Sequence, residues 1–196
     1  MQSRCPWVTH DPQYIAYHDT QWGRPVTDSR ELFEKLCLDG QQAGLSWLTI
    51  LKRSDGYRRA FANFEPQQIA RFGVEDVERL RQDSGIIRNR LKIESIIKNA
   101  RAYLAMEAEG IDFATFLWSF VGGKVQINHW QSVSEAPTSS PESDAMSRAL
   151  KQRGFNFVGT TICYAFMQAV GMVNDHELGC PCHAQCVALA KEKQLT

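Results

Sequence analysis

The sequence predicts an all-α fold. Apolar residues recur at helical spacing along most of the chain, whereas the alternation of apolar and polar residues that is typical of strands is almost absent. Capping residues and glycines stand at the ends of the periodic segments, where helices begin and end. With 196 residues and a hydrophobic content of 43%, the chain is long and apolar enough to bury a sizeable core.

The first half of the chain predicts several short helices. Capping residues at 27–29 begin a helix that ends near Leu38, with apolar residues along one face. Residues 45–51 predict a second, nearly all-apolar helix, which follows a break rich in glycine. A short amphipathic piece is expected at 58–64, and a further helix at 74–80.

The second half continues in the same way. A long helix is expected from about residue 89 to 106, where apolar residues recur at core spacing. Residues 111–121 are apolar enough to be buried, and from 122 to 140 the pattern fails, which predicts a loop or a short extended segment. Serine and proline then begin a helix that ends at Gly154, and residues 158–170 predict a last buried helix.

The overall charge excludes some classes of protein. Lysine and arginine together number 22, as do aspartate and glutamate, so a histone-like or polybasic binder is excluded while a local basic patch is not. No apolar run approaches the length of a membrane span, and residues 1–7 lack the apolar stretch of a signal peptide. We therefore expect a cytoplasmic protein without disulfides.

Six cysteines and several histidines raise the question of a metal site. Cys5 and His18 lie near the start of the chain, and the candidates near its end are His176, Cys180, Cys182, His183 and Cys186. The other two cysteines, Cys37 and Cys163, lie in apolar helical stretches and are expected to be small core residues.

A structural zinc ion needs four thiolate or imidazole ligands in a tetrahedron. Cys5 and His18, together with His176 and Cys180, would supply two of each, and such a site would hold the two chain ends together. The spacing does not choose among the ligands near the end of the chain. The alternative is that these scattered residues bind no metal.

Residues 80–90 suggest a site for an anion. They predict a helix, a tight turn at Gly85 and a new helix, and such a turn presents backbone N–H groups to a phosphate. Five positive charges follow within fourteen residues: Arg88, Arg90, Lys92, Lys98 and Arg101. This local concentration is suited to a nucleic-acid backbone. The alternative is an ordinary helical hairpin with a solvated basic face.

Aromatic residues gather near one carboxylate. The rings are Trp7, Tyr14, Tyr17, Trp22 and Trp47, and Asp39 precedes a bend at 40–44. Stacked rings and a carboxylate together favour a flat, positively charged ligand, since the ring faces attract cations. The alternative is that the rings fill the core and Asp39 caps a helix end.

Several motifs resemble a known family. They are Arg-Cys-x-Trp at 4–7, Tyr-Ile-Ala-Tyr-His-Asp-x-x-Trp-Gly at 14–23, Gly-Gln-Gln-Ala-Gly-Leu-Ser-Trp at 40–47, Gly-Ile-Ile-Arg at 85–88, Phe-Val-Gly-Thr-Thr at 157–161 and Val-Asn-Asp-His at 173–176. The chain resembles the bacterial 3-methyladenine DNA glycosylase I family, which belongs to the helix-hairpin-helix glycosylases. The resemblance covers residues 4 to 180.

This resemblance implies a fold and a set of site residues. It implies a helical core at 26–171 with the hairpin at about 74–106, and end segments 1–25 and 172–196 joined by one structural zinc ion. The implied zinc ligands are Cys5, His18, His176 and Cys180, in preference to Cys182 and Cys186. The implied contacts to the DNA backbone are Gly85, Ile86, Ile87, Arg88 and Arg90. The implied base-binding residues are Trp7, Tyr14, Tyr17, Asp39 and Trp47.

One residue departs from the family pattern. The family usually carries Glu where this chain has Asp39, which is the implied catalytic residue. Losing one methylene shortens the reach of the carboxylate by roughly 1.5 Å. A bond from this carboxylate to the base is then longer or bridged by water.

The resemblance also implies an activity. The expected reaction is hydrolysis of the bond that joins 3-methyladenine to deoxyribose in alkylated double-stranded DNA, after the nucleotide is flipped out of the duplex, with free 3-methyladenine as product. We expect a monomer that leaves the strand intact, since the family acts without a Schiff base and no lysine is expected beside Asp39 or in the turn at 85–87. Two alternatives are a damage-recognition protein with weak catalysis and a zinc hydrolase that uses Cys5, His18 and a water.

Overall fold

Helices make up most of the structure, a computed structural model that describes residues 3–193. The first half contains α1 (Pro12–Thr20), α2 (Ser29–Gln41), α3 (Trp47–Leu51), α4 (Ser54–Ala60), η1 (Ala62–Phe64), α5 (Pro66–Ile69) and α6 (Val74–Leu80). The second half contains α7 (Arg90–Ala108), α8 (Phe113–Trp118), η2 (Ser119–Val121), β1 (Gln126–Ile127), η3 (Val133–Glu135), α9 (Pro141–Gln152), α10 (Thr160–Ala169), β2 (Val173–Asn174) and α11 (Pro181–Glu192). This confirms the prediction of a helical fold.

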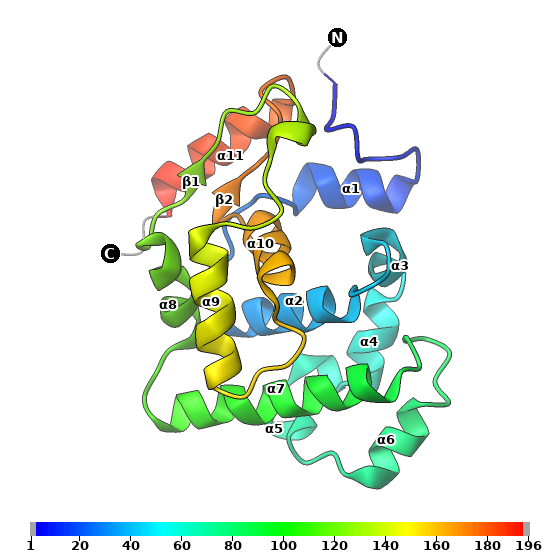
Figure 1. The fold of residues 1–196 in the computed structure, drawn as a ribbon. Coiled ribbons are helices and arrows are strands. Elements are labelled where there is room, and N and C mark those ends of the chain that lie inside the picture. The colour runs from blue at the N-terminus through cyan, green and yellow to red at the C-terminus, as the bar shows by residue number, and fades with distance from the viewer. Residues whose placement is uncertain (1–2, 194–196) are drawn as a thin grey trace.

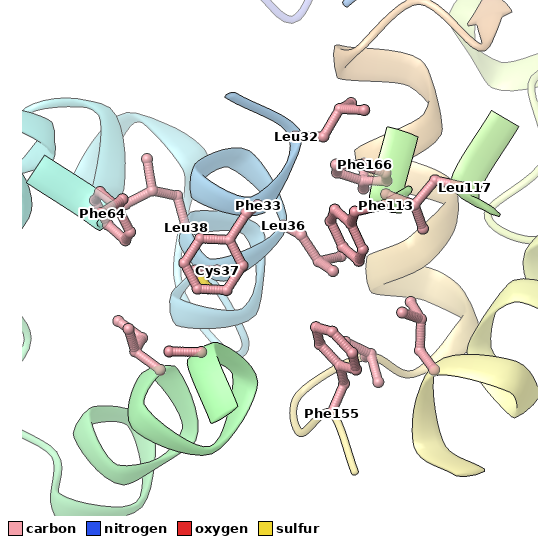
Figure 2. Packing of buried hydrophobic residues seen from close by; sticks show 14 of the residues in the cluster. Leu32, Phe33, Leu36, Cys37, Leu38, Phe64, Phe113, Leu117, Phe155 and Phe166 are labelled. Atoms are coloured by element: carbon pink, nitrogen blue, oxygen red, sulfur yellow. The ribbon is translucent and has the colours of Figure 1, made fainter. Parts of the chain in front are cut away.

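Two helices, α2 and α10, lie at the centre of the molecule. Helix α2 begins where the carboxylate of Asp28 accepts hydrogen bonds from the next turn, as the sequence predicts, and packs against α10 and α7. Figure 2 shows its residue Leu36 beside Phe113 and Phe155, whose rings stack 5.7 Å apart. The centre of the protein is therefore an apolar core that fixes the direction of α2.

Helices α6 and α7 are joined by a nine-residue connection that contains Gly85. This connection lies directly against α4: a Cβ atom on Gly56 would be 2.2 Å from the carbonyl oxygen of Gly85. The hydroxyl of Tyr57 accepts a hydrogen bond from the N–H of Ile87 and donates one to the side chain of Gln41. The turn is thus packed against the centre of the fold and is linked to the end of α2.

Helices α1 and α11 lie on the side of the molecule opposite α7 (Figure 1), and there Cys5, near the start of the chain, contacts His176, near its end. There the short strands β1 and β2 pair in parallel, with Gln126 opposite Val173 and Ile127 opposite Asn174. The expected loop or extended segment at 122–140 contains β1 and the turn η3. Of the predicted end segments, residues 1–2 and 194–196 lie outside the described residues.

Three helices were not predicted from the sequence. They are α1, the single turn α5, and α11, which runs through the stretch that follows Cys180. Helix α11 buries Cys182, His183 and Cys186, and the side chain of Asn174 in β2 donates a hydrogen bond to the carbonyl of His183. Among residues 3–193, no helix combines the length and apolar character that crossing a bilayer requires.

Candidate functional site

Asp39 lies in the last turn of α2, on the wall of a cavity of about 200 Å³. Its side chain is 3% exposed. One carboxylate oxygen accepts a hydrogen bond from Lys35 over 2.8 Å, while the other, Oδ2, is buried without a hydrogen-bond partner among residues 3–193. A buried, unpartnered oxygen is costly unless a ligand satisfies it, so this atom indicates a binding site.

Aromatic rings from three parts of the chain surround this carboxylate. The structure brings together all five residues predicted for the base pocket, which line the cavity: Trp7, Tyr14, Tyr17, Asp39 and Trp47. The rings of Tyr17 and Trp47 lie 5.4 Å apart and those of Trp7 and Tyr14 5.2 Å apart. The indole Nε1 of Trp47 is also buried, and no described residue accepts a hydrogen bond from it. The cavity therefore offers ring faces and two unsatisfied polar atoms.

Local features of the sequence hold these rings in place. The hydroxyl of Ser46 accepts from the N–H of Thr49 and begins α3, so Trp47 is the first residue of that helix. Tyr14 and Tyr17 are three residues apart on α1, which places them on one face. Asp11 caps this helix by accepting hydrogen bonds from its first turn.

A buried lysine fixes the bend that follows Asp39. Lys92 of α7 donates hydrogen bonds to the carbonyls of Gln41 and Ala43, over 2.8 and 2.7 Å. The interpretation of Lys92 as part of an exposed basic stripe is therefore wrong. Its ammonium group instead holds the 40–44 bend against α7, where it satisfies carbonyls at the end of α2.

Lys35 is the main feature of the cavity that the sequence analysis missed. It lies one helical turn before Asp39, and its ammonium group is 3.3 Å from the centre of the Trp47 ring. Burial raises the pKa of the Asp39 carboxyl and lowers the pKa of the Lys35 ammonium, and the opposite charge of each partner limits these shifts. The expectation that no lysine lies beside Asp39 is wrong. The contact was indicated by the sequence, because Lys35 and Asp39 are four residues apart and therefore share one face of a helix.

A second carboxylate, that of Asp175, also lies on the cavity wall. Both of its oxygens are engaged, because the carboxylate accepts hydrogen bonds from four side chains: Asn128, Trp130, Tyr164 and Gln168. Asp175 thereby ties the segment after β1 to helix α10. The motif at 173–176 contains this residue, but nothing in the sequence shows that its partners converge on it.

Four side chains from the two ends of the chain form a cluster suited to a metal ion. All the ligand atoms of Cys5, His18, His176 and Cys180 lie within 4.8 Å of one another, and all four residues are buried. Sulfur to nitrogen distances are 3.5 Å from Cys5 to His176 and 3.6 Å from Cys180 to His18. A tetrahedral zinc ion holds sulfur and nitrogen ligands about 3.6 Å apart, so the donor set and its spacing fit.

The outer contacts of both histidines suit metal binding. Nε2 of His176 lies 2.9 Å from the carbonyl oxygen of Trp22, which can only accept a hydrogen bond, so this nitrogen carries the proton. Nδ1 of His18 lies 2.7 Å from the carboxylate of Asp19. The nitrogens that face the thiols are therefore free to bind a metal, an arrangement common around metal ligands.

The remaining cysteines take other places. Cys182 lies with His18 and Asp19 at the edge of the cluster, where the three form a second group of potential ligands. Cys186 is buried on α11 and belongs to neither group found within residues 3–193. Cys37 and Cys163 lie in the main apolar core, which confirms their interpretation as small core residues.

The predicted phosphate-binding turn is in part engaged within the protein. The N–H of Gly85 donates to the carboxylate of Asp83, and that of Ile87 donates to Tyr57, while Ile86 is buried. Arg88 and Arg90 are both exposed, and Arg90 also forms ion pairs with Glu78 and Glu94. Of the other predicted cations, Lys98 is exposed and Arg101 donates to the carbonyls of Ala70 and Phe72. Arg88 and Lys98 are thus the cations of this set whose side chains make neither an ion pair nor a hydrogen bond within residues 3–193.

Known proteins resemble the chain over almost its whole length. It is 60% identical over 180 residues to DNA-3-methyladenine glycosylase 1 of Escherichia coli strain K12, which covers 92% of this chain and 96% of that protein. A crystal structure of 3-methyladenine DNA glycosylase I matches with a TM-score of 0.92 and 62% identity, covering 92% of this chain and all of that one.

A third relative was determined with a ligand. It is a variant of 3-methyladenine DNA glycosylase I in complex with 3-methyladenine, and it matches with a TM-score of 0.87 and 40% identity over 91% of this chain and 96% of that one. The family model described as methyladenine glycosylase matches residues 7–183. The chain belongs to the methyladenine glycosylase family.

Proposed function

We propose that this protein is a DNA glycosylase that hydrolyses the bond between 3-methyladenine and deoxyribose in alkylated DNA. Its family and its relatives named for this activity support the proposal. The observation that carries it is the cavity itself, where Oδ2 of Asp39 and Nε1 of Trp47 are buried between aromatic rings with no hydrogen-bond partner in the described part of the chain. A flat base with polar edges would satisfy both atoms.

The cavity is suited to a base that carries a positive charge. Methylation at N3 makes the base in DNA cationic, and ring faces and a carboxylate both attract a cation more strongly than neutral adenine. In this proposal Trp7, Tyr14, Tyr17 and Trp47 stack around the flipped base and Asp39 orients it. The positive charge already weakens the glycosidic bond, so strong acid catalysis by the protein is unnecessary.

The reaction then needs little from the protein beyond binding. The bond between the base and C1′ breaks with its electrons going to the base, which leaves neutral, and water adds to C1′ to leave an abasic site. Asp39 attracts the cationic base and keeps it oriented in the cavity until the bond breaks. Arg88 and Arg90, with the turn at Gly85, Ile86 and Ile87, form the proposed contact to the DNA backbone.

We propose that the cluster of Cys5, His18, His176 and Cys180 holds one structural zinc ion. Its thiolate and imidazole donors match zinc, and four protein ligands complete a tetrahedron, which argues against a zinc hydrolase that uses a bound water. When bound, the ion links the terminal segments, 1–25 and 172–196, to each other. Trp7 and Tyr14 are thereby held over the cavity.

The decisive experiment is to incubate the protein with methylated duplex DNA and identify the released bases by chromatography. We expect free 3-methyladenine, intact strands and abasic sites. Release no faster than the spontaneous rate would refute the proposed function, and cleaved strands would refute its monofunctional form.

The alternative of a weakly catalytic damage-recognition protein depends on the shorter side chain of Asp39. The variant Asp39→Glu restores the longer reach, and affinity for abasic DNA serves as its control. A large rise in turnover at unchanged affinity would favour this alternative. Equal turnover would remove its basis.

A further inference from the structure

Lys35 occupies the position in the cavity that a cationic ligand would take. Its ammonium group lies 3.3 Å from the centre of the Trp47 ring, 5.6 Å from that of Tyr17 and 2.8 Å from Oδ1 of Asp39. These are the two attractions, ring faces and a carboxylate, that a cationic base would use. The protein thus fills its own cation site with a side chain.

The ammonium group and a bound base cannot share this position. Two cations in one cavity repel each other, and the ring face that a base would stack on is covered by Lys35. We propose that Lys35 is the displaceable counter-ion of Asp39, leaving the cavity when a cationic base binds and returning to expel the neutral base after hydrolysis. This inference rests on the proposed function.

The structure offers a place for the displaced side chain. A second cavity of about 540 Å³ shares Lys35, Tyr17 and Trp47 with the base cavity. Its wall also contains Glu31, which lies one turn before Lys35 on α2 and forms no ion pair within the described residues. Since Asp39 is four residues after Lys35 and Glu31 four before it, a change in the side-chain torsions moves the ammonium group from one carboxylate to the other.

The chemistry of the reaction gives this exchange a direction. The base binds as a cation, so it replaces the charge of Lys35 next to the buried carboxylate. When the bond to C1′ breaks, its electron pair neutralises the base, water supplies the hydroxyl group to C1′, and a proton is released to solvent. The neutral product has lost its ionic attraction to Asp39, whereas the ammonium group of Lys35 has kept it. Lys35 therefore competes best at the stage of product release.

The test is to measure the affinity of two free ligands by calorimetry at pH 8. One is 3-methyladenine, which is neutral at this pH, and the other is the 3,9-dimethyladeninium ion, which is permanently charged. In Lys35→Met, whose side chain has similar length without the charge, we expect both dissociation constants to fall by the same factor, about tenfold. Equal factors are expected because both ligands displace the same side chain.

The control is Lys191→Met, which removes one positive charge from the exposed face of α11. Both affinities should be unchanged in this variant. If Lys35→Met tightened binding of the cation alone, Lys35 would stay in the cavity and act by repulsion, which would overturn the proposal. Unchanged or weaker binding of both ligands would overturn it as well.

A second measurement uses the unaltered protein and so does not depend on the folding of a variant. A short pulse of acetic anhydride labels accessible amines, and mass spectrometry reports the extent at each lysine. Saturating 3-methyladenine should increase the labelling of Lys35, which is 16% exposed in the free protein, and leave that of Lys191 unchanged. Equal or lower labelling of Lys35 would contradict its displacement.

The two proposals fail in different ways. If the unaltered protein releases no 3-methyladenine from methylated DNA, the proposed function and this inference both fall. If it releases the base while the affinities and the labelling of Lys35 do not change as expected, the inference alone falls.

Discussion

The carbonyl of Trp22 accepts a hydrogen bond from Nε2 of His176 over 2.9 Å. This contact joins the two halves of the site. Trp22 lines the cavity and packs edge-on against Trp7, while His176 turns its other nitrogen toward Cys5 and Cys180. The orientation of a potential metal ligand is thus linked to the aromatic wall of the cavity.

If the cluster holds zinc as proposed, removing one ligand should release the metal and destabilise the fold. In Cys180→Ala we expect elemental analysis to find no zinc and the melting temperature to fall by roughly 10 °C or more, which corresponds to about 3 kcal/mol for a chain of this size. The matched control is Cys186→Ala, a buried cysteine of α11 outside the cluster, which should keep its zinc. Zinc retained in Cys180→Ala would contradict the proposed ligand set.

Removing a ring of the cavity should affect binding more than folding. Trp47→Ala should weaken binding of 3-methyladenine by roughly 10- to 100-fold, because stacking of a base on an aromatic ring is worth about 1–3 kcal/mol. Its melting temperature should fall less than that of Cys180→Ala, since Trp47 is half-buried at the surface of the core. Matching thermal shifts in the two variants would contradict this division of roles.

The activity should depend on the ionisation of Asp39. Burial raises the pKa of this carboxyl above its ordinary value of 3.8, and the positive charge of Lys35 opposes the shift. Tyr17 faces the Asp39 carboxyl from α1. Protonation removes the charge that attracts the cationic base, so kcat/KM should fall as the pH drops through this raised pKa. Asp39→Asn should be roughly 100-fold less active and lack this acid limb.

Protonation of Asp39 does not lower kcat/KM at acid pH by unfolding the protein. A carboxyl whose pKa is raised in the folded state contributes stability that is fully present below its unfolded pKa and is lost as the pH rises. Initial rates on methylated DNA, corrected for spontaneous depurination, measure the limb. A midpoint near 3.8 would show that the carboxylate is solvated rather than buried.

The close contact between α4 and the glycine turn should matter for DNA. In Gly56→Ala the new methyl group would lie 2.2 Å from the carbonyl oxygen of Gly85, so the turn must move. We expect a loss of stability of about 1–3 kcal/mol and weaker binding of duplex DNA, with unchanged affinity for free 3-methyladenine. The control is Gly73→Ala, where a Cβ atom meets nothing within 4 Å. Unchanged DNA binding in Gly56→Ala would argue against a role for the turn.

Local signals in the sequence predicted much of the fold. Asn89 caps α7, and Ser140 with the following proline begins α9, as expected, because caps act within one turn of the chain. The two-residue strands could not be predicted, since their pairing depends on residues almost fifty positions apart. Helix α1 was missed because its apolar residues face the cavity and the cluster rather than one continuous core.

Some residues of the site could be predicted from the sequence and others could not. The five predicted cavity residues were found together because four of them lie in long, specific motifs and Asp39 directly precedes one of these. The position of Lys92 could not be predicted, because its burial depends on carbonyls of a bend fifty residues earlier that accept from its ammonium group. Arg88 and Lys92 look alike in the sequence, and only their three-dimensional surroundings distinguish them.

The meeting of the chain ends has a consequence for biosynthesis. Cys5 and His176 are separated by 171 residues, so a ribosome must synthesise residues 5 to 180 before the four side chains of the cluster can meet. On the proposal that this cluster binds zinc, the segment that carries Trp7 gains the support of the metal only after Cys180 has left the exit tunnel. The nascent protein therefore acquires its aromatic wall last, and zinc starvation during translation should leave a folded core without a finished pocket.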